Sequence, residues 1–164
     1  MLKKAIICDI DGVLLETKHI FEEIEKANLT GASKWDYFNR RANDYDVEVD
    51  SRVIELLETF ANQGFRIIFL TARSIEIEKQ TRAKIELAIA RFSESIFDFL
   101  LIMRPSRNID SADKVKETWL HLLREKYDVM FAIDDDKANC DMFKSNNILT
   151  LQVHKADCAQ RVKA

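Results

Sequence analysis

The sequence predicts an α/β protein in which helices cover both faces of a parallel sheet. Short apolar runs alternate along the chain with segments of helical periodicity, and these runs are apolar throughout rather than at every second residue. Strands of that kind are buried on both faces and are joined by helical crossovers. The chain has only 3 glycines and 1 proline among 164 residues, which favours helices with short connections over a turn-rich sandwich. Its length corresponds to about one domain, 1–164.

Each element follows from its own pattern. Five buried strands are expected, at 4–10, 65–71, 97–103, 128–133 and 148–153. Helices are expected at 15–29, 34–42, 51–63, 74–92, 111–126 and 137–145. The helix at 51–63 is well marked, because its apolar residues share one face and Gly64 follows it in the position that commonly ends a helix. Thr30 and Gly31 are expected to end the first helix of a small insert, 15–50.

The composition excludes several classes of protein. Apolar residues make up 47% of the chain and charged residues 32%, unlike a disordered or collagen-like chain. The apolar runs are too short to span a membrane, and the N-terminus has no signal-peptide pattern, so we expect a cytoplasmic protein with no membrane partner. Cys8, Cys140 and Cys158 are expected to be free thiols. A net charge of −3 means that a nucleic acid would need a local basic patch.

Acidic residues stand at the ends of two expected strands. The first strand ends with Asp9 and Asp11, and Gly12 then permits a sharp turn. The fourth strand is followed by Asp134, Asp135 and Asp136. Carboxylates this close repel one another unless a cation lies between them. An acidic turn before a helix explains one or two of these acids, whereas a divalent cation explains the set, so a metal site is the preferred interpretation.

Two further positions offer phosphate ligands. Thr71, Ala72 and Arg73 close the second strand, although for this tripeptide alone helix capping by Thr71 is the simpler interpretation. Lys114 and Lys116 lie in the first turn of a helix, where a cation opposes the helix dipole and needs compensation. Lys116 shares a face with apolar residues and is expected to lean toward the sheet, whereas Lys114 is expected to be solvated. Because the carboxyl ends of parallel strands meet at one edge, these residues and the acids predict a single site.

This order of motifs resembles that of the haloacid-dehalogenase-like (HAD) phosphohydrolase superfamily. The matching segments are DIDGVL from Asp9, LTAR from Leu70, the segment of Lys114 and Lys116, and IDDD from Ile133. A closer similarity, over about 4–153, is to the 3′-phosphatase domain of bacteriophage polynucleotide kinase and its bacterial relatives. It rests on WDYF from Trp35, MRP from Met103, SADKVKETWL from Ser111, YDV from Tyr127 and LQV from Leu151. Asp136 departs from these relatives, which often carry arginine there.

The resemblance implies a three-layer, Rossmann-like α/β/α domain and a phosphatase that forms an aspartyl-phosphate. Asp9 would be the nucleophile, and Asp11 would be the general acid and then the general base. Lys116 falls on the lysine of the family's third motif, and it would neutralise the phosphoryl group and tether Asp9. Asp11 would need a pKa above its usual value to act as an acid.

The resemblance also implies ligands for a cofactor and for the substrate. Mg²⁺ would be held by Asp9, Asp11 through its backbone carbonyl, Asp134 and Asp135. Asn139 is a weaker candidate that would support this site. Thr71 and the N–H of Ala72 would hold the phosphoryl oxygens. Arg73 and Arg104 are weaker candidates for substrate contact, since both could equally be solvated rim charges.

The insert at 15–50 stands where superfamily members carry a cap. Two short helices are too little for a separate lid, and a partly open site would admit a large substrate such as a nucleic-acid end. The side chains that would stack on bases or contact phosphates are His19, Trp35, Tyr37, Phe38, Arg40 and Arg41. Packing against the core is the preferred role for Trp35 and Phe38.

The leading prediction is an Mg²⁺-dependent phosphatase that acts on polynucleotide 3′-phosphate ends. A phosphatase for a nucleotide or sugar phosphate is the second hypothesis, favoured by the net charge and by Asp136. A catalytically idle binding module is the third, and the complete set of Asp9, Asp11, Asp135 and Lys116 argues against it. No P-loop motif is present, so we expect no kinase within the chain, which leaves room for a separate kinase or ligase partner.

Overall fold

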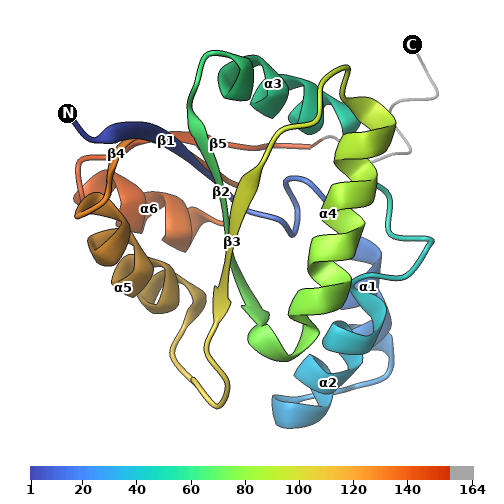
Figure 1. Cartoon of the computed structure of the whole chain (residues 1–164). Coiled ribbons are helices and arrows are strands. Elements are labelled where there is room, and N and C mark those ends of the chain that lie inside the picture. The colour runs from blue at the N-terminus through green and yellow to red at the C-terminus, as the bar shows by residue number, and fades with distance from the viewer. Residues whose placement is uncertain (156–164) are drawn as a thin grey trace.

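The computed structural model describes residues 1–155, and Cys158 lies outside them (Figure 1). Its strands are β1 (Lys3–Cys8), β2 (Arg66–Ser74), β3 (Phe99–Arg104), β4 (Tyr127–Asp134) and β5 (Leu149–Gln152). Its helices are α1 (Lys18–Lys26), α2 (Gly31–Arg41), α3 (Ser51–Asn62), α4 (Glu78–Phe92), α5 (Ala112–Arg124) and α6 (Lys137–Ser145), with a short 3₁₀ turn, η1 (Ile75–Ile77). The predicted α/β class and the number of elements within the described residues are therefore confirmed.

The five strands form one sheet with the order β3-β2-β1-β4-β5, and every neighbouring pair is parallel. The chain moves outward from β1 to β3 and then returns to place β4 on the other side of β1. This reversal of strand order lies between β1 and β4, and ligands of open α/β sheets bind in the crevice outside such a point. Asp9 follows β1 directly and Asp134 ends β4, so two of the predicted acids flank the crevice.

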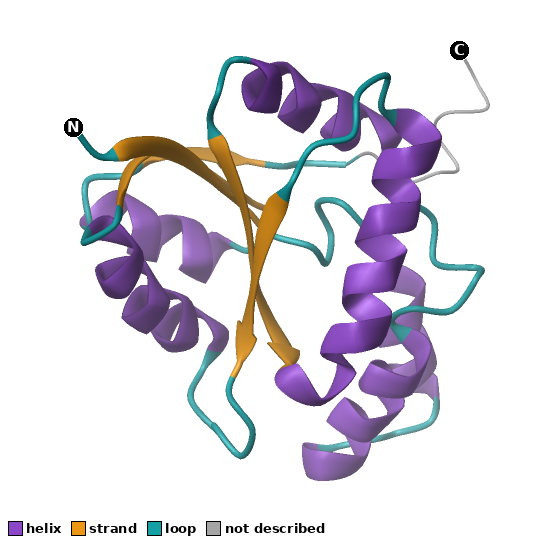
Figure 2. Ribbon diagram, in the orientation of Figure 1, coloured by secondary structure: helices purple, strands orange, loops and turns teal. Residues whose placement is uncertain are grey.

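Helices cover both faces of the sheet, which gives the three expected layers (Figure 2). α5 and α6 lie on one face, and α3, α4 and the helices of the insert lie on the other (Figure 1). Successive residues of β1 point to opposite faces, so Ile6 and Cys8 join one core cluster while Ala5 and Ile7 join the other. Burial on both faces explains the apolar runs of β1, β2 and the end of β4. The edge strand β5 has no buried residue, so the expectation of a buried strand there was wrong.

Helices α1 and α3 end in the same hydrogen-bonding arrangement, which α6 also has at Asn147, although only α3 has glycine there. After α3, Gly64 adopts φ +86°, and the N–H of Phe65 donates to the carbonyl of Phe60. The rings of Phe60 and Phe65 also pack, with their centroids 5.4 Å apart. After α1, Asn28 takes the corresponding position with φ +52°. Both ends are Schellman motifs, in which asparagine substitutes for glycine in the left-handed conformation.

Several predicted boundaries were wrong, and tertiary contacts explain the differences. The first helix begins at Lys18 rather than at position 15, because Leu15 pairs with Asp11 and Val49 in isolated bridges. It ends before Asn28, so Thr30 and Gly31 do not terminate it; Gly31 is instead the first residue of α2. The second strand runs past Thr71 to Ser74, where it pairs with Arg104 of β3 after an irregularity in the register.

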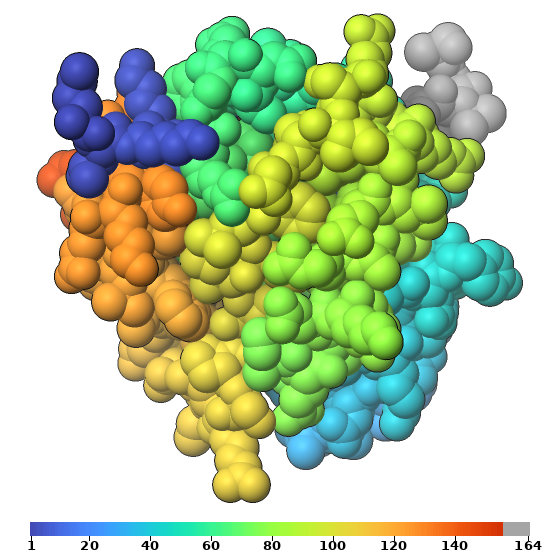
Figure 3. Space-filling model, in the orientation of Figure 1, coloured from blue at the N-terminus to red at the C-terminus, as the bar shows by residue number. Residues whose placement is uncertain are grey.

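The insert is small, as predicted, and a single arginine ties its parts together. Its helices α1 and α2 pack against each other, and α2, coloured cyan, lies beside α4 in the space-filling view (Figure 3). Arg41 donates hydrogen bonds to Glu23 of α1 and to Asp44 and Asp46 of the following loop. The guanidinium therefore holds the insert as one unit.

No helix among residues 1–155 is long and apolar enough to cross a membrane. The cytoplasmic location stays a prediction. Cys8 and Cys140 are both buried free thiols, as predicted.

Candidate active site

Lys116 joins the ends of β1 and β4. Its Nζ lies 2.8 Å from Oδ1 of Asp9 and 2.7 Å from Oδ2 of Asp134, and all three side chains are buried. Burial opposes the charged form of the lysine, but the two carboxylates outweigh it and raise the pKa of Lys116. Lys116 therefore leans toward the sheet as its helix face predicted, whereas Lys114 is exposed. The question of which lysine faces the acids is settled in favour of Lys116.

Asp9 lies in an environment that disfavours its negative charge. Burial raises the pKa of Asp9, Lys116 lowers it, and the charges of Asp134 and Asp11 raise it again. The net direction is upward, because burial, together with the charges of Asp134 and Asp11, outweighs the single ammonium group. A cation at this position would offset the excess negative charge.

Asp135 approaches the turn that follows β1 so closely that only glycine fits there. Gly12 adopts φ +76°, and a Cβ on it would lie 2.0 Å from Oδ2 of Asp135. Although Asp135 is an exposed residue, the surrounding protein desolvates its carboxyl, and this desolvation together with the charge of Asp134 raises the pKa of Asp135 to about 6. Ligand atoms of Asp9, Asp134 and Asp135 all lie within 4.8 Å of one another, so the cluster could hold a metal ion.

The donor set of this cluster fits a hard divalent cation such as Mg²⁺. Its ligand atoms are carboxylate oxygens, which Mg²⁺ prefers. Asp134 is already engaged, since Oδ1 accepts from the N–H of Asp136 and from Nδ2 of Asn139, and Oδ2 accepts from Lys116. Asp9 and Asp135 are therefore freer to bind the ion directly. Oδ1 of Asn139 is buried without a hydrogen-bond partner among the described residues, which suits a nearby ion or its water.

Asp136 has a structural explanation. Its carboxylate accepts the N–H of Asn139 at 3.0 Å and caps the N-terminus of α6. A carboxylate in this position is stabilised by the free N–H groups and by the helix dipole. Of the three consecutive acids, one is thus a helix cap, as the simpler interpretation allowed, and the other two remain at the cation site.

Arg73 binds Asp11 with two nitrogen atoms. Its Nε and Nη2 donate to Oδ2 and Oδ1 of Asp11 at 2.9 and 2.7 Å. The same guanidinium donates to Oδ1 of Asn43 at 2.7 Å and to the carbonyl of Ala42 at 3.1 Å. The Arg73 side chain has no exposed surface, so it is not the solvated rim charge considered above. Its position indicates that it orients Asp11, and a direct substrate contact finds no support in this arrangement.

The remaining predicted phosphate ligands lie around the end of β2. Thr71 is buried, and its hydroxyl accepts the N–H of Arg73 at 3.2 Å. It does not cap the following helix; Ser74 accepts the N–H of Glu76 instead, so the capping interpretation was wrong. Arg104 donates to the carbonyl of Ala72 at 2.9 Å and to the loop that follows β3. The guanidinium of Arg104 thus braces the backbone next to the expected phosphate position.

The aromatic and basic residues of the insert divide into packed and exposed groups. Phe38 is buried and stacks on Phe21, as its predicted packing role requires. Trp35 touches Phe38 edge-on but remains 53% exposed. Arg40 is exposed. The other three side chains, His19, Tyr37 and Arg41, are half-buried. Tyr37 and Arg41 contact the carboxylate of Glu23, and His19 lies near that of Asp46.

The sequence interpretation missed three supporting residues. Asn43 holds Arg73 from the loop after α2, a segment in which no chemistry was expected. Gln152 donates to the carbonyl of Asp135, and Lys155 donates to the carbonyl of Val13 in the turn after Asp11. The partners of these three residues are distant in the sequence, so local patterns do not predict the contacts. Of the three, only Gln152 lies in a segment, LQV, on which the resemblance rests.

These features together define the class of protein. A parallel sheet carries an Asp-x-Asp pair after β1, a buried threonine in β2, a buried lysine and a second pair of acids where β4 ends, which is the arrangement of a HAD-type phosphohydrolase. The sequence model described as the polynucleotide kinase PNKP phosphatase domain matches residues 3–158. The chain belongs to this family. It is therefore a HAD-family phosphohydrolase, as predicted.

Solved structures with the same fold agree with this assignment. Two chains from structures entitled Pnkp1/Rnl/Hen1 complex and Pnkp1/Rnl/Hen1 RNA repair complex are 24% and 25% identical, with TM-scores of 0.67. Each match covers 95% of this chain, which spans 47% and 44% of theirs. A HAD family enzyme from Bacteroides thetaiotaomicron, in complex with magnesium and inorganic phosphate, is 13% identical over the whole of both chains, with a TM-score of 0.51. Among curated proteins none matches the chain.

Proposed function

We propose that the protein is an Mg²⁺-dependent phosphatase that removes 3′-phosphates from polynucleotide ends through an aspartyl-phosphate. One observation carries the chemistry: the two acids of the turn after β1 have different partners. Asp9 is buried and forms an ion pair with Lys116. Asp11 forms an ion pair with Arg73, and 21% of its side chain remains exposed. Two neighbouring carboxylates with separate environments suit two separate roles.

The first step transfers the phosphoryl group to Asp9. A carboxylate oxygen of Asp9 attacks phosphorus in line with the leaving oxygen, and the phosphorus–oxygen bond to that oxygen breaks. Asp11, protonated on one oxygen, gives its proton to the leaving oxygen. The contact with Arg73 holds the Asp11 carboxyl in position for this transfer.

The second step returns the enzyme to its starting state. Asp11, now ionised and bound by Arg73 on both oxygens, takes a proton from a water molecule. The water oxygen attacks phosphorus, the bond to Asp9 breaks, and inorganic phosphate leaves. Lys116 stabilises the charge on Asp9 in both steps, because its ammonium group lies 2.8 Å from the carboxylate.

Asp9, Asp135 and the backbone carbonyl of Asp11 would hold Mg²⁺, with Asp134 supporting Lys116 and Asn139. When bound, the ion supplies electrostatic stabilisation to the phosphoryl oxygens. The hydroxyl of Thr71 and the N–H of Ala72 would also bind these oxygens. Because Thr71 is buried and fixed by Arg73, its hydroxyl is already oriented by the fold.

The family and the architecture support a polynucleotide end as substrate. The matching family is described as the phosphatase domain of a polynucleotide kinase, and a similar chain occurs in an RNA repair complex with Rnl and Hen1. The small insert supports the same choice, since it lacks the size of a closing lid. A separate kinase or ligase is the kind of partner that such a repair activity would need.

Phosphate release tests this substrate directly. We expect the protein with Mg²⁺ to release phosphate from a 3′-phosphorylated oligonucleotide with a kcat/KM well above those for mononucleotides and sugar phosphates. Asp9→Asn serves as the inactive control. Turnover of the small phosphates alone would keep the chemistry but replace the polynucleotide with a small molecule.

A further inference from the structure

Every N–H group of the Arg73 guanidinium has an acceptor. Two of its five N–H groups donate to the oxygens of Asp11. The other three reach outside the sheet: Nη2 donates to the carbonyl of Ala42 at 3.1 Å, and Nη1 donates to Oδ1 of Asn43 at 2.7 Å and to Oγ1 of Thr81 at 3.4 Å. Because the five N–H groups lie in one rigid plane, these three contacts determine how the guanidinium faces Asp11.

The insert supplies most of these outer contacts. Ala42 and Asn43 directly follow α2, and the ring centroid of Phe38 in α2 lies 5.8 Å from Cζ of Arg73. Thr81 belongs to the first turn of α4 and is fully buried. The arginine of β2 is therefore held between the end of α2 and the start of α4.

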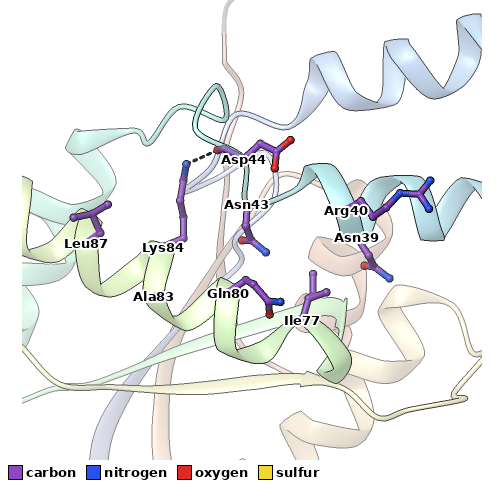
Figure 4. Close-up of a pocket in the computed structure, with 9 residues that line it drawn as sticks. All are labelled: Asn39, Arg40, Asn43, Asp44, Ile77, Gln80, Ala83, Lys84 and Leu87. Atoms are coloured by element: carbon purple, nitrogen blue, oxygen red, sulfur yellow. Dashed lines mark hydrogen bonds between the residues drawn. The ribbon is translucent and has the colours of Figure 1, made fainter.

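Asn43 joins the two segments that hold the arginine. A guanidinium can only donate, so the amide faces it with Oδ1, and Nδ2 then donates to Oγ1 of Thr81 at 3.3 Å. Figure 4 shows the Asn43 side chain pointing from its loop toward α4. The backbone of this loop is tied to the same helix, because Lys84 donates to the carbonyl of Asp44 at 2.8 Å (Figure 4). The position of the amide is thus fixed on both sides.

Loss of the Asn43 oxygen would disturb more than one hydrogen bond. The Arg73 side chain has no exposed surface, so an unpaired N–H there is costly and the guanidinium is driven to turn toward other acceptors. Both contacts with Asp11 belong to the same rigid group and move with it. A change at Asn43 is therefore transmitted to the carboxyl of Asp11.

We propose that Asn43 is a positioning residue for the leaving-group step: through Arg73 it holds the Asp11 carboxyl where it protonates the leaving oxygen. The insert then acts as a fixed support for this proton transfer rather than as a lid. The inference rests on the proposed function, since it assigns the insert a part in the first step of the same reaction.

Two oligonucleotides that differ in one atom test this role. One carries its 3′-phosphate on oxygen, and the other carries it on sulfur, which leaves as a thiolate with little need for a proton. Asn43→Leu is similar in size but removes the acceptor, so we expect it to lower the oxygen-to-sulfur ratio of kcat/KM about tenfold. Asn39→Leu, four positions earlier in α2, is the matched control and should leave the ratio unchanged, because Asn39 takes no part in the five hydrogen bonds of Arg73.

The ratio separates positioning from a loss of folded protein. A smaller active fraction lowers both kcat/KM values equally and leaves their ratio unchanged. The double variant Arg73→Lys, Asn43→Leu shows whether Asn43 acts through Arg73, since its ratio should equal that of Arg73→Lys alone. An unchanged ratio in Asn43→Leu, an equal fall in Asn39→Leu, or a further fall in the double variant would overturn the proposal.

A second variant decides the question if Asn43→Leu yields no folded protein. Thr81→Val removes the hydroxyl at nearly constant size, and it should lower the same ratio about threefold, because both Asn43 and Arg73 lose a partner. An unchanged ratio in Thr81→Val would then overturn the positioning role.

Failure of the proposed function gives a different result. If the parent protein hydrolyses neither oligonucleotide but turns over small phosphates, the polynucleotide substrate is wrong. The comparison is then made between a small alkyl phosphate and an aryl phosphate, whose leaving groups differ in the same way. An alkyl-to-aryl ratio that is unchanged in Asn43→Leu would overturn the positioning role, and absence of any turnover by the parent would overturn both proposals.

Discussion

Two basic side chains, Lys116 and Arg73, organise the acids of the site in different ways. Lys116 lies between the carboxylates of Asp9 and Asp134. Because all three groups are buried, the charged state of each carboxylate depends on the ammonium group. Arg73 forms a planar two-nitrogen contact with Asp11, which fixes the orientation of the carboxylate as well as its charge. The consequences of replacing each residue should therefore differ.

Replacement of Lys116 should affect stability as well as activity. Lys116→Met leaves two buried carboxylates without their cation, so we expect the free energy of unfolding of the metal-free protein to fall by about 3–5 kcal/mol. Urea denaturation measures this change. Lys114→Met, in the same turn but exposed, is the matched control and should shift stability by less than about 0.5 kcal/mol. Equal stability of the two variants would contradict the buried ion cluster.

Replacement of Arg73 should affect turnover rather than substrate affinity. Arg73→Lys retains the charge but loses the planar contact, so Asp11 is no longer held in position. We expect kcat for a 3′-phosphorylated oligonucleotide, whose alkoxide leaving group needs the proton of Asp11, to fall by about 10²-fold with little change in KM. A rise in KM with an unchanged kcat would instead show that Arg73 binds the substrate.

At the scale of the elements, helix ends decide where the functional loops begin. α3 is capped at its N-terminus by Asp50, whose carboxylate accepts the N–H of Arg52, and it is followed by the Schellman motif at Gly64. Lys155 also lies 3.3 Å from Asp50, so the N-terminus of α3 meets the chain after β5. These contacts fix the last part of the insert against the core.

The end of α3 offers a clean test of backbone conformation. Gly64 has φ +86°, and no atom lies within 4 Å of the position that a Cβ would take, so only backbone strain opposes a side chain there. Gly64→Ala should lower the free energy of unfolding by about 1 kcal/mol. Gly64→Asn should lose less, because asparagine occupies the equivalent position after α1. Equal losses in thermal denaturation would contradict this explanation.

The start of α3 should give a pH-dependent contribution to stability. The hydrogen bonds from Arg52, aided by Lys155, lower the pKa of Asp50 from 3.8 to about 2. A lowered pKa means that the ionised carboxylate stabilises the fold above pH 3.8 and that this contribution is lost as the pH falls toward 2. Asp50→Asn keeps an N-cap but removes the charge, so it should be less stable than the parent at neutral pH and similar to it near pH 2. A stability difference that does not vary with pH would contradict the assignment.

At the scale of the whole molecule, the sequence was sufficient for the fold class and for which residues lie together at the candidate site, but not for how they pair there. Apolar runs and helical periodicity located every strand and helix of the described chain, because burial on both faces leaves a strong local pattern. Ends such as Ser74 were misplaced, since they depend on a partner strand. Asp9 and Lys116 were found from a strand end and a helix face.

The role of Arg73 could not be found in that way. Asp11 lies 62 positions away in the sequence, and an arginine at a strand end can face either the solvent or a carboxylate. Asn43 was missed for the same reason, since its loop has no pattern that indicates a contact with β2. Local patterns therefore identify which residues are present at the edge of the sheet, whereas their partners follow only from the three-dimensional arrangement.

Detection of a phosphoryl group on Asp9 tests the central claim most directly. Asp11→Asn cannot activate water, but an aryl phosphate has a leaving group that needs no proton, so the aspartyl-phosphate should accumulate in this variant with Mg²⁺. Acid quenching followed by peptide mass spectrometry should locate one phosphoryl group on Asp9, and none should appear in the Asp9→Asn, Asp11→Asn double variant. Turnover by the parent protein with no phosphoryl group on Asp9 in Asp11→Asn, or with the group on another residue, would contradict the mechanism.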